Sequence, residues 1–201
     1  MTGDKKSKTR LPGFSIIEML VVVAVFSFSI LILSQTYLSF IRLSHRTANS
    51  AVVQQDMRFV LEYITRMARH TAIAYPVPPG SLEAATSTLT LSGKDQLDWI
   101  IKLSEAGDAL CGDSSGVKCL LVSGDAGVNW APITSKKVNV EKFQILVRPS
   151  QTPFMLQGNA YLNNQQPYVT LLIKMTYMAP NDRETVSLEA QTSISSRVYV
   201  R

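Results

Sequence analysis

Charged residues are missing from one long stretch near the start of the chain. None occurs in the 23 positions from Met19 to Ile41, and most of these positions are apolar. At about 1.5 Å per residue a helix of this length is roughly 35 Å long, more than the hydrocarbon thickness of about 30 Å. The stretch therefore predicts a transmembrane helix, which we place at residues 14–41.

The pattern of polar and apolar positions then changes, although no helix-breaking residue interrupts the chain. No Gly or Pro lies in residues 14–75, and a proline follows directly. Apolar residues recur at spacings of four, three, four and three, as on one face of an amphipathic helix: Val53, Met57, Val60, Ile64 and Met67. Arg58, Glu62 and Arg66 lie at intervals of four on another face and predict modest ion pairing. We expect residues 42–75 to be the amphipathic half of one long helix.

Residues 76–201 show the alternation that is typical of strands. Four stretches are alternating or strand-like: the one around Leu89 and Leu91, and residues 138–149, 169–177 and 186–194. The turn-like sequence APNDRE separates the last two and predicts an antiparallel hairpin. A long helix packed on an antiparallel sheet makes the predicted fold α+β.

The positive charge of the chain is concentrated before the apolar stretch. Residues 1–12 carry four basic side chains and one acid, a net +3, which leaves +2 of the formal +5 for all later residues. A basic leader stays on the cytoplasmic side, so everything after Arg42 is predicted to lie outside. No small-residue pair that would suit secretory cleavage follows Leu33, so we expect the helix to be retained. With so little charge on the remainder, we do not expect nucleic acid as a partner.

The sequence GFSIIE at residues 13–18 follows this leader directly and places one acid, Glu18, near the start of the apolar stretch. Together with the leader and the apolar run, it resembles the processing signal of type IV prepilins and type II secretion pseudopilins. The resemblance implies that residues 1–13 are a leader cleaved by a prepilin peptidase between Gly13 and Phe14. It also implies N-methylation of Phe14, the new first residue. The alternative is an acid that simply lies at the headgroups, where its cost is small.

The same resemblance implies a role for Glu18 in assembly. Cleavage would leave a cationic amine on Phe14, and two opposite charges in an apolar medium gain by pairing. The chain is most similar to W-type minor pilins and J-type minor pseudopilins, which implies a structural subunit that initiates or caps a filament. Implied partners are other major and minor pilins or pseudopilins, the inner-membrane assembly platform and membrane lipid. The implied location is the cytoplasmic membrane and then the filament tip, with the globular domain periplasmic. The membrane half lacks the Pro or Gly that bends the helix in many major pilins.

The two cysteines, Cys111 and Cys119, lie close together in residues 76–201. An oxidising compartment favours a disulfide between them, with a metal site or two free thiols as alternatives. Asp108, Asp113 and Asp125 fall in expected loops, but their spacing fits no calcium-loop template. We therefore predict neither a metal nor another cofactor.

No catalytic motif occurs in the sequence: there is no nucleophile elbow, P-loop, zinc-protease helix or dinucleotide fingerprint. We expect a structural protein and not an enzyme. Two alternatives remain open. One is a membrane-anchored periplasmic enzyme or binding domain with a fortuitous pilin-like start, and the other is a competence pilin for DNA uptake.

Overall fold

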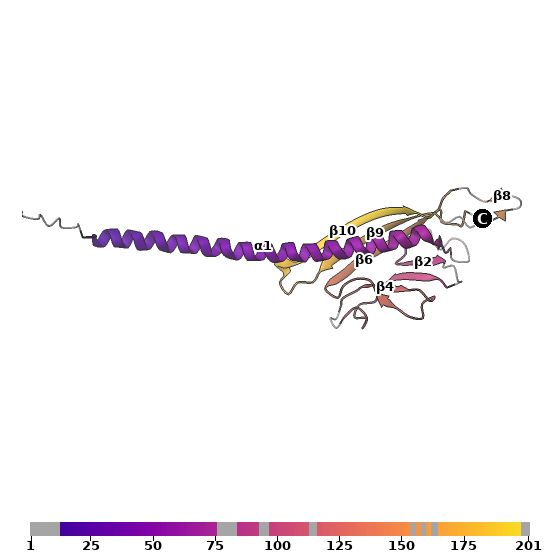
Figure 1. The fold of residues 1–201 in the computed structure, drawn as a ribbon, viewed down its shortest axis with the longest axis horizontal. Helices are drawn as coiled ribbons and strands as arrows, with labels where there is room; N and C mark the ends of the chain where they lie inside the picture. Colours follow the sequence, from indigo (N-terminus) through magenta and orange to yellow (C-terminus); the bar gives the residue numbers. More distant parts are fainter. Residues whose placement is uncertain are drawn as a thin grey trace, which may run out of the picture. The chain divides into compact units, whose positions relative to one another are not determined.

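The computed structural model describes residues 13–75, 84–92, 97–112, 116–153, 156–157, 160–161 and 165–197. It divides into two compact units, Met1–Ser44 and His45–Arg201. One helix, α1 (Ile16–His70, 55 residues), contributes to both units. The chain has an α+β fold, as predicted, because the second half of α1 packs against antiparallel sheets (Figure 1).

The part of α1 in the first unit is apolar on every side. All its side chains are exposed except that of Ile41, which is half-buried. Four of its hydroxyls donate to carbonyls four residues earlier, those of Ser27, Ser29, Ser34 and Thr36. These bonds satisfy polar groups that an apolar solvent could not. This helix is long and apolar enough to cross a membrane and lies near the N-terminus.

The part of α1 in the second unit buries one face. Its buried residues are Val53, Met57, Val60, Ile64 and Ala68. The predicted apolar face is therefore confirmed, apart from its last position, where Ala68 is buried and Met67 is half-buried. The helix ends at His70 and not at 75 as predicted. The Thr71 hydroxyl donates to the Met67 carbonyl at 2.6 Å, and the next two residues enter a strand.

A three-stranded sheet contributes ten of the 21 buried residues of the main core. It contains β6 (Val138–Arg148), β9 (Tyr168–Tyr177) and β10 (Val186–Ser195) in the antiparallel order β10-β9-β6. These are three of the predicted strands, and β9 and β10 form the predicted hairpin. A single turn of 3-10 helix, η1 (Asp182–Glu184), lies in their connection.

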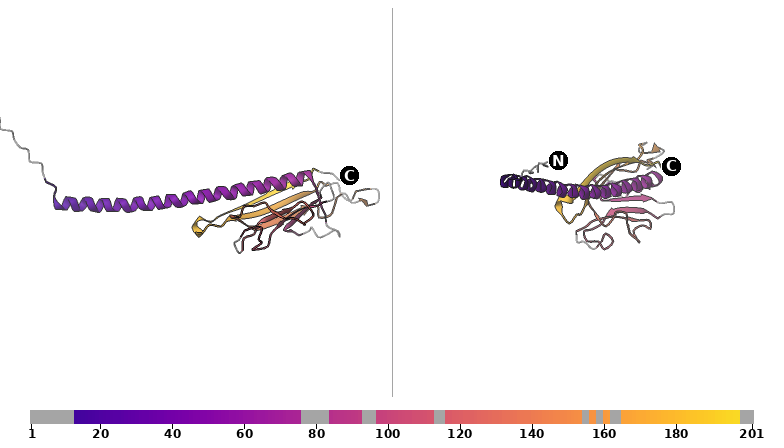
Figure 2. Two further views of the ribbon diagram at one scale, coloured as in Figure 1. Left: turned by 60° about the horizontal axis from the view of Figure 1, so that its bottom comes forward. Right: turned by 60° about the vertical axis from the view of Figure 1, so that its left-hand side comes forward.

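A five-stranded sheet packs beside it in the same unit. Its strands are β1 (Ala72–Ile73), β2 (Thr88–Ser92), β3 (Trp99–Leu103), β4 (Leu120–Ser123) and β5 (Ala131–Pro132), in that order and antiparallel. The predicted strand around Leu89 and Leu91 is β2. Reciprocal hydrogen bonds of 2.9 and 2.8 Å between Thr86 and Ile145 link the two sheets. Both views of Figure 2 place the strands beside the second half of α1. A short hairpin, β7 (Leu156–Gln157) and β8 (Ala160–Tyr161), completes the described elements.

Candidate functional site

The predicted cleavage site lies just before the first turn of α1. Gly13, Phe14 and Ser15 are not helical, and α1 begins at the next residue. The Ser15 carbonyl accepts hydrogen bonds from the N–H groups of Glu18 (3.1 Å) and Met19 (3.2 Å), which starts the helix. The Gly13–Phe14 peptide bond is therefore held by no secondary structure, and the Phe14 side chain is 71% exposed.

The glycine before this bond is not required by the fold. A Cβ built on Gly13 meets no atom within 4 Å, and its φ lies outside the left-handed region that favours glycine. Any preference for glycine at this position therefore comes from a molecule that acts on the chain and not from the packing of the chain itself.

Glu18 is the one side chain between residues 13 and 41 that is charged at neutral pH. It lies in the first turn of α1, where the helix dipole favours a negative charge. The side chain is exposed, and no described side chain forms an ion pair or hydrogen bond with it. The arrangement thus leaves the carboxylate available to a cation that is not among the described groups.

The two cysteines form a disulfide, as predicted, with their Cα atoms 5.4 Å apart. Both are buried in a small cluster with Leu121, against which Trp130 packs. Ser104 fixes this cluster to β3, because its hydroxyl accepts from the Cys119 N–H at 2.9 Å and its own N–H donates to the Cys119 carbonyl at 2.9 Å. The cluster is separate from the main core and depends on its own contacts.

Two of the three loop acids lie among the described residues, and both accept hydrogen bonds from groups in their own loops. Both carboxylate oxygens of Asp125 accept hydrogen bonds, from the Ser123 hydroxyl (2.6 Å) and from the backbone and side chain of Asn129 (2.9 and 2.6 Å). These bonds, led by that of Ser123, lower the pKa of Asp125 to about 2. Asp108 accepts from the Leu110 N–H at 3.0 Å, and Asp113 lies outside the described residues. No group of three or more His, Cys, Asp or Glu residues able to hold a metal occurs in the described part of the chain.

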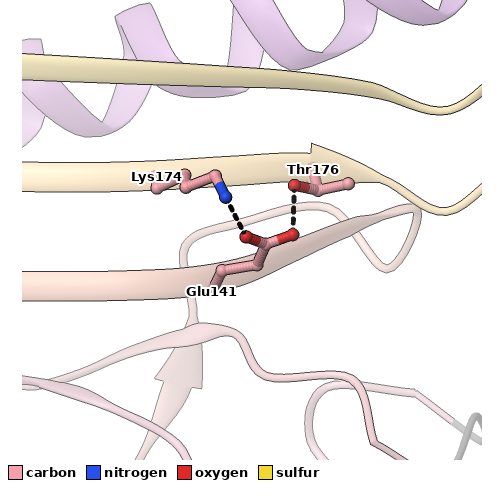
Figure 3. Close-up of polar contacts among 3 residues, drawn as sticks. All are labelled: Glu141, Lys174 and Thr176. Carbon is pink, nitrogen blue, oxygen red and sulfur yellow. Dashed lines mark hydrogen bonds and ion pairs between the residues drawn. The ribbon is translucent and has the colours of Figure 1, made fainter.

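One polar cluster was not predicted from the sequence. The Glu141 carboxylate pairs with the Lys174 ammonium at 2.6 Å and accepts a hydrogen bond from the Thr176 hydroxyl at 2.6 Å (Figure 3). The contact with Lys174, followed by that with Thr176, lowers the pKa of Glu141. Glu141 sits where the register of β6 on β9 shifts between Val140 and Lys142. A bulge of this kind leaves no simple signal in the sequence.

The ion pairs predicted along α1 are absent from the described residues: Arg58, Glu62 and Arg66 form no pair within 4.0 Å. They lie instead along a groove of about 820 Å³. Comparisons of the chain with protein-family models, with curated proteins and with solved structures give no match.

Proposed function

We propose that the chain is a minor pilin or pseudopilin, a structural subunit that initiates or caps a type IV pilus or a type II secretion pseudopilus. The observation that carries the proposal is the start of the chain. An exposed, non-helical Gly13–Phe14 bond lies just before α1, and Glu18 is the one acid in the apolar first part of that helix.

Each feature of this start suits one step of prepilin maturation. A peptidase needs an extended bond in its active site, and the bond after Gly13 is free of helix. Removal of residues 1–13 also removes the basic leader and leaves Phe14 as the first residue, ready for N-methylation. The membrane helix keeps the processed subunit in the cytoplasmic membrane until it is assembled, with the second unit on the periplasmic side.

Assembly then uses the charge at Glu18. The new amine of Phe14 is cationic at neutral pH, since an α-amino group has a pKa of roughly 7.7 to 8. When a subunit docks, the amine and the carboxylate pair in an apolar surrounding, where either charge alone is heavily penalised. The pair fixes the register between neighbouring pilins or pseudopilins, and the assembly platform in the membrane supplies the place where they meet.

Processing is the first test of the proposal. In cells that contain a prepilin peptidase, mass spectrometry of the membrane-extracted protein should find an N-terminus at Phe14. Gly13→Val should leave the full precursor, because the bulkier side chain does not fit before the cut. Gly3→Val, a matched change in the leader away from the cut, should be processed normally. An intact Met1 in the wild-type protein would contradict the proposal and favour a membrane-anchored enzyme or binding domain.

Incorporation into filaments is the second test. Glu18→Gln should be inserted and cleaved like the wild type, yet be depleted in sheared filaments more than about tenfold. Breaking a buried pair costs about 3 to 5 kcal/mol, and each 1.4 kcal/mol is about a factor of ten. Glu105→Gln, an exposed loop acid in the second unit, is the control. Equal incorporation of Glu18→Gln and wild type would remove the pairing role from Glu18.

A further inference from the structure

Strand β10 is paired along one side only. All ten of its residues pair with β9, from Val186 with Tyr177 to Ser195 with Tyr168. No other element in the described ranges pairs with its outer edge. In an antiparallel pair every second residue turns its N–H and C=O away from the partner, so about half of β10 offers these groups to a further strand. An open edge of this length is a template for strand addition.

The opposite edge of the same sheet is partly closed. There Thr86 exchanges two backbone hydrogen bonds with Ile145 of β6, at 2.9 and 2.8 Å. The chain thus covers part of one edge of the three-stranded sheet with its own backbone and leaves the other edge open among the residues described. β10 also pairs with β9 without a register shift, whereas the pairing of β6 with β9 shifts between Val140 and Lys142.

The inner face of β10 is less covered than that of its neighbour. The inward residues of β9, such as Leu171 and Ile173, are 0% exposed, whereas Leu188 and Ala190 of β10 are only half-buried. The groove of about 820 Å³ lies here, where Leu188 faces the second half of α1. In Figure 1, β10 runs alongside this part of α1. A strand added to β10 would therefore lie over the helix and fill the groove.

The groove has an apolar floor and a basic rim. Its apolar side chains are Met57, Leu61 and Leu188. Its rim carries three arginines and His70 but one acid, a formal net charge of +2 with the histidine neutral; the charged rim residues are Arg58, Glu62, Arg66 and Arg69. Such a rim is complementary to an acidic segment. A second copy of this chain would present its own β10, which carries a single acid, Glu189, and is therefore less complementary to the basic rim.

The length of the groove sets the length of the segment. The residues of α1 that line it run from Gln54 to His70, about 24 Å at about 1.5 Å per residue. An extended chain covers that distance in about seven residues at roughly 3.4 Å each.

We propose that the open edge of β10 and this groove bind an extended segment of another protein. The segment adds a strand of about seven residues to β10. Its side chains toward the groove are apolar in the middle, over Met57 and Leu61, and acidic at the ends, beside Arg58 and Arg69. This inference goes beyond the proposed function and does not depend on it, because it rests on residues of the second unit alone.

The test uses the full chain in neutral detergent micelles and a blocked synthetic peptide, Glu-Thr-Val-Thr-Ile-Thr-Glu, in isothermal titration calorimetry. The first, third, fifth and seventh side chains of this peptide share one face of a strand. We expect saturable binding that falls about tenfold or more when lysine replaces both glutamates. The double variant Arg66→Gln/Arg69→Gln should bind about tenfold more weakly. Lys136→Gln/Lys137→Gln, two exposed cations outside the groove, should bind as wild type does.

Backbone methylation of the peptide separates strand addition from any other mode of binding. N-methyl groups on the third and fifth residues block one edge of the peptide, and on the fourth and sixth residues the other. One of these peptides should lose binding and the other should keep it. No saturable binding up to about 1 mM, equal binding of the lysine peptide, or indifference to both methylation patterns would each overturn the proposal. Self-association of the chain that the acidic peptide does not reverse would assign the edge to a second copy, and would overturn it as well.

Discussion

The two halves of α1 form the same secondary structure under opposite rules of burial. In the first unit the helix is apolar all round and leaves its side chains exposed, whereas in the second unit a single face is buried, at Val53, Met57, Val60, Ile64 and Ala68. Neither half contains a Gly or Pro, so no helix breaker separates them. The difference lies in the solvent that each half requires. A helix that is hydrophobic all round suits lipid, and a helix with one stripe suits the surface of a protein core.

A matched pair of isoleucines gives the largest expected contrast. Ile64 is 0% exposed, and Ile64→Ala should destabilise the second unit by about 2 to 5 kcal/mol through lost burial and the cavity left behind. In scanning calorimetry of the full chain in micelles, Tm should fall by about 5 to 15 °C. Ile30→Ala makes the same chemical change at a 46% exposed position of the same helix and should leave this transition unmoved. Equal losses in both variants would contradict the division of α1.

A charge placed in the first half of α1 tests whether that half lies in lipid. Val23→Arg should disfavour membrane insertion by about 2.5 to 3.5 kcal/mol, because Val23 lies inside the uncharged stretch. Alkaline extraction of membranes should then release a larger share of the variant than of the wild type. Gln55→Arg, at an exposed position of the second half, is the matched control and should stay in the membrane fraction. Equal extraction of both variants would argue that the first half does not span a bilayer.

The disulfide lies in the small cluster of the second unit, apart from the main core. The double variant Cys111→Ser/Cys119→Ser should lose about 2.5 kcal/mol, the chain-entropy value for a closed loop of nine residues. Reductant should lower the Tm of wild type to that of the variant and leave the variant unchanged. A variant with the Tm of wild type would mean that the bridge contributes nothing to the stability of the unit.

The smallest expected effect is electrostatic. Glu141→Gln should cost about 0.2 to 1 kcal/mol at neutral pH, because the pair with Lys174 is more than a third exposed. The folded-state pKa of Glu141 is lowered, so this stabilisation is present above the ordinary carboxyl pKa of about 4.3 and is lost as the pH falls through the lowered value. The difference in Tm between the variant and wild type should therefore shrink from pH 7 to about pH 3. A difference that grew in acid would contradict the assignment.

The sequence predicted the elements whose burial follows a simple period. Strands β6, β9 and β10 alternate, and the buried face of α1 repeats every three or four residues, so all four could be located in advance. β4 was missed because Leu120–Ser123 is buried at every position and has no alternation to detect. The end of α1 was placed five residues too late because Ala72–Ile73 pairs with β2, a tertiary contact that helix propensity does not contain.

The candidate sites divide in the same way. Gly13, Phe14 and Glu18 could be proposed from the sequence because their motif is contiguous, and their roles stay predictions. The disulfide between Cys111 and Cys119, which are eight residues apart, was predicted and is present. The Glu141 cluster joins residues from two strands at a shifted register, and the groove joins α1 to a strand more than a hundred residues later. Neither could be found without the three-dimensional arrangement.

The positions of the two tryptophans have a practical spectroscopic consequence. Trp99 lies so close to Gly124 that a Cβ there would be 2.9 Å from its ring, and Trp130 lies beneath the Lys102 ammonium at 4.0 Å. Both belong to the second unit, and the apolar helix has no indole at all. Tryptophan fluorescence therefore reports on the second unit alone, in any lipid or detergent that surrounds the first unit. A Gly124→Ala chain, in which the Trp99 ring must move, would identify the share of the emission that comes from that ring.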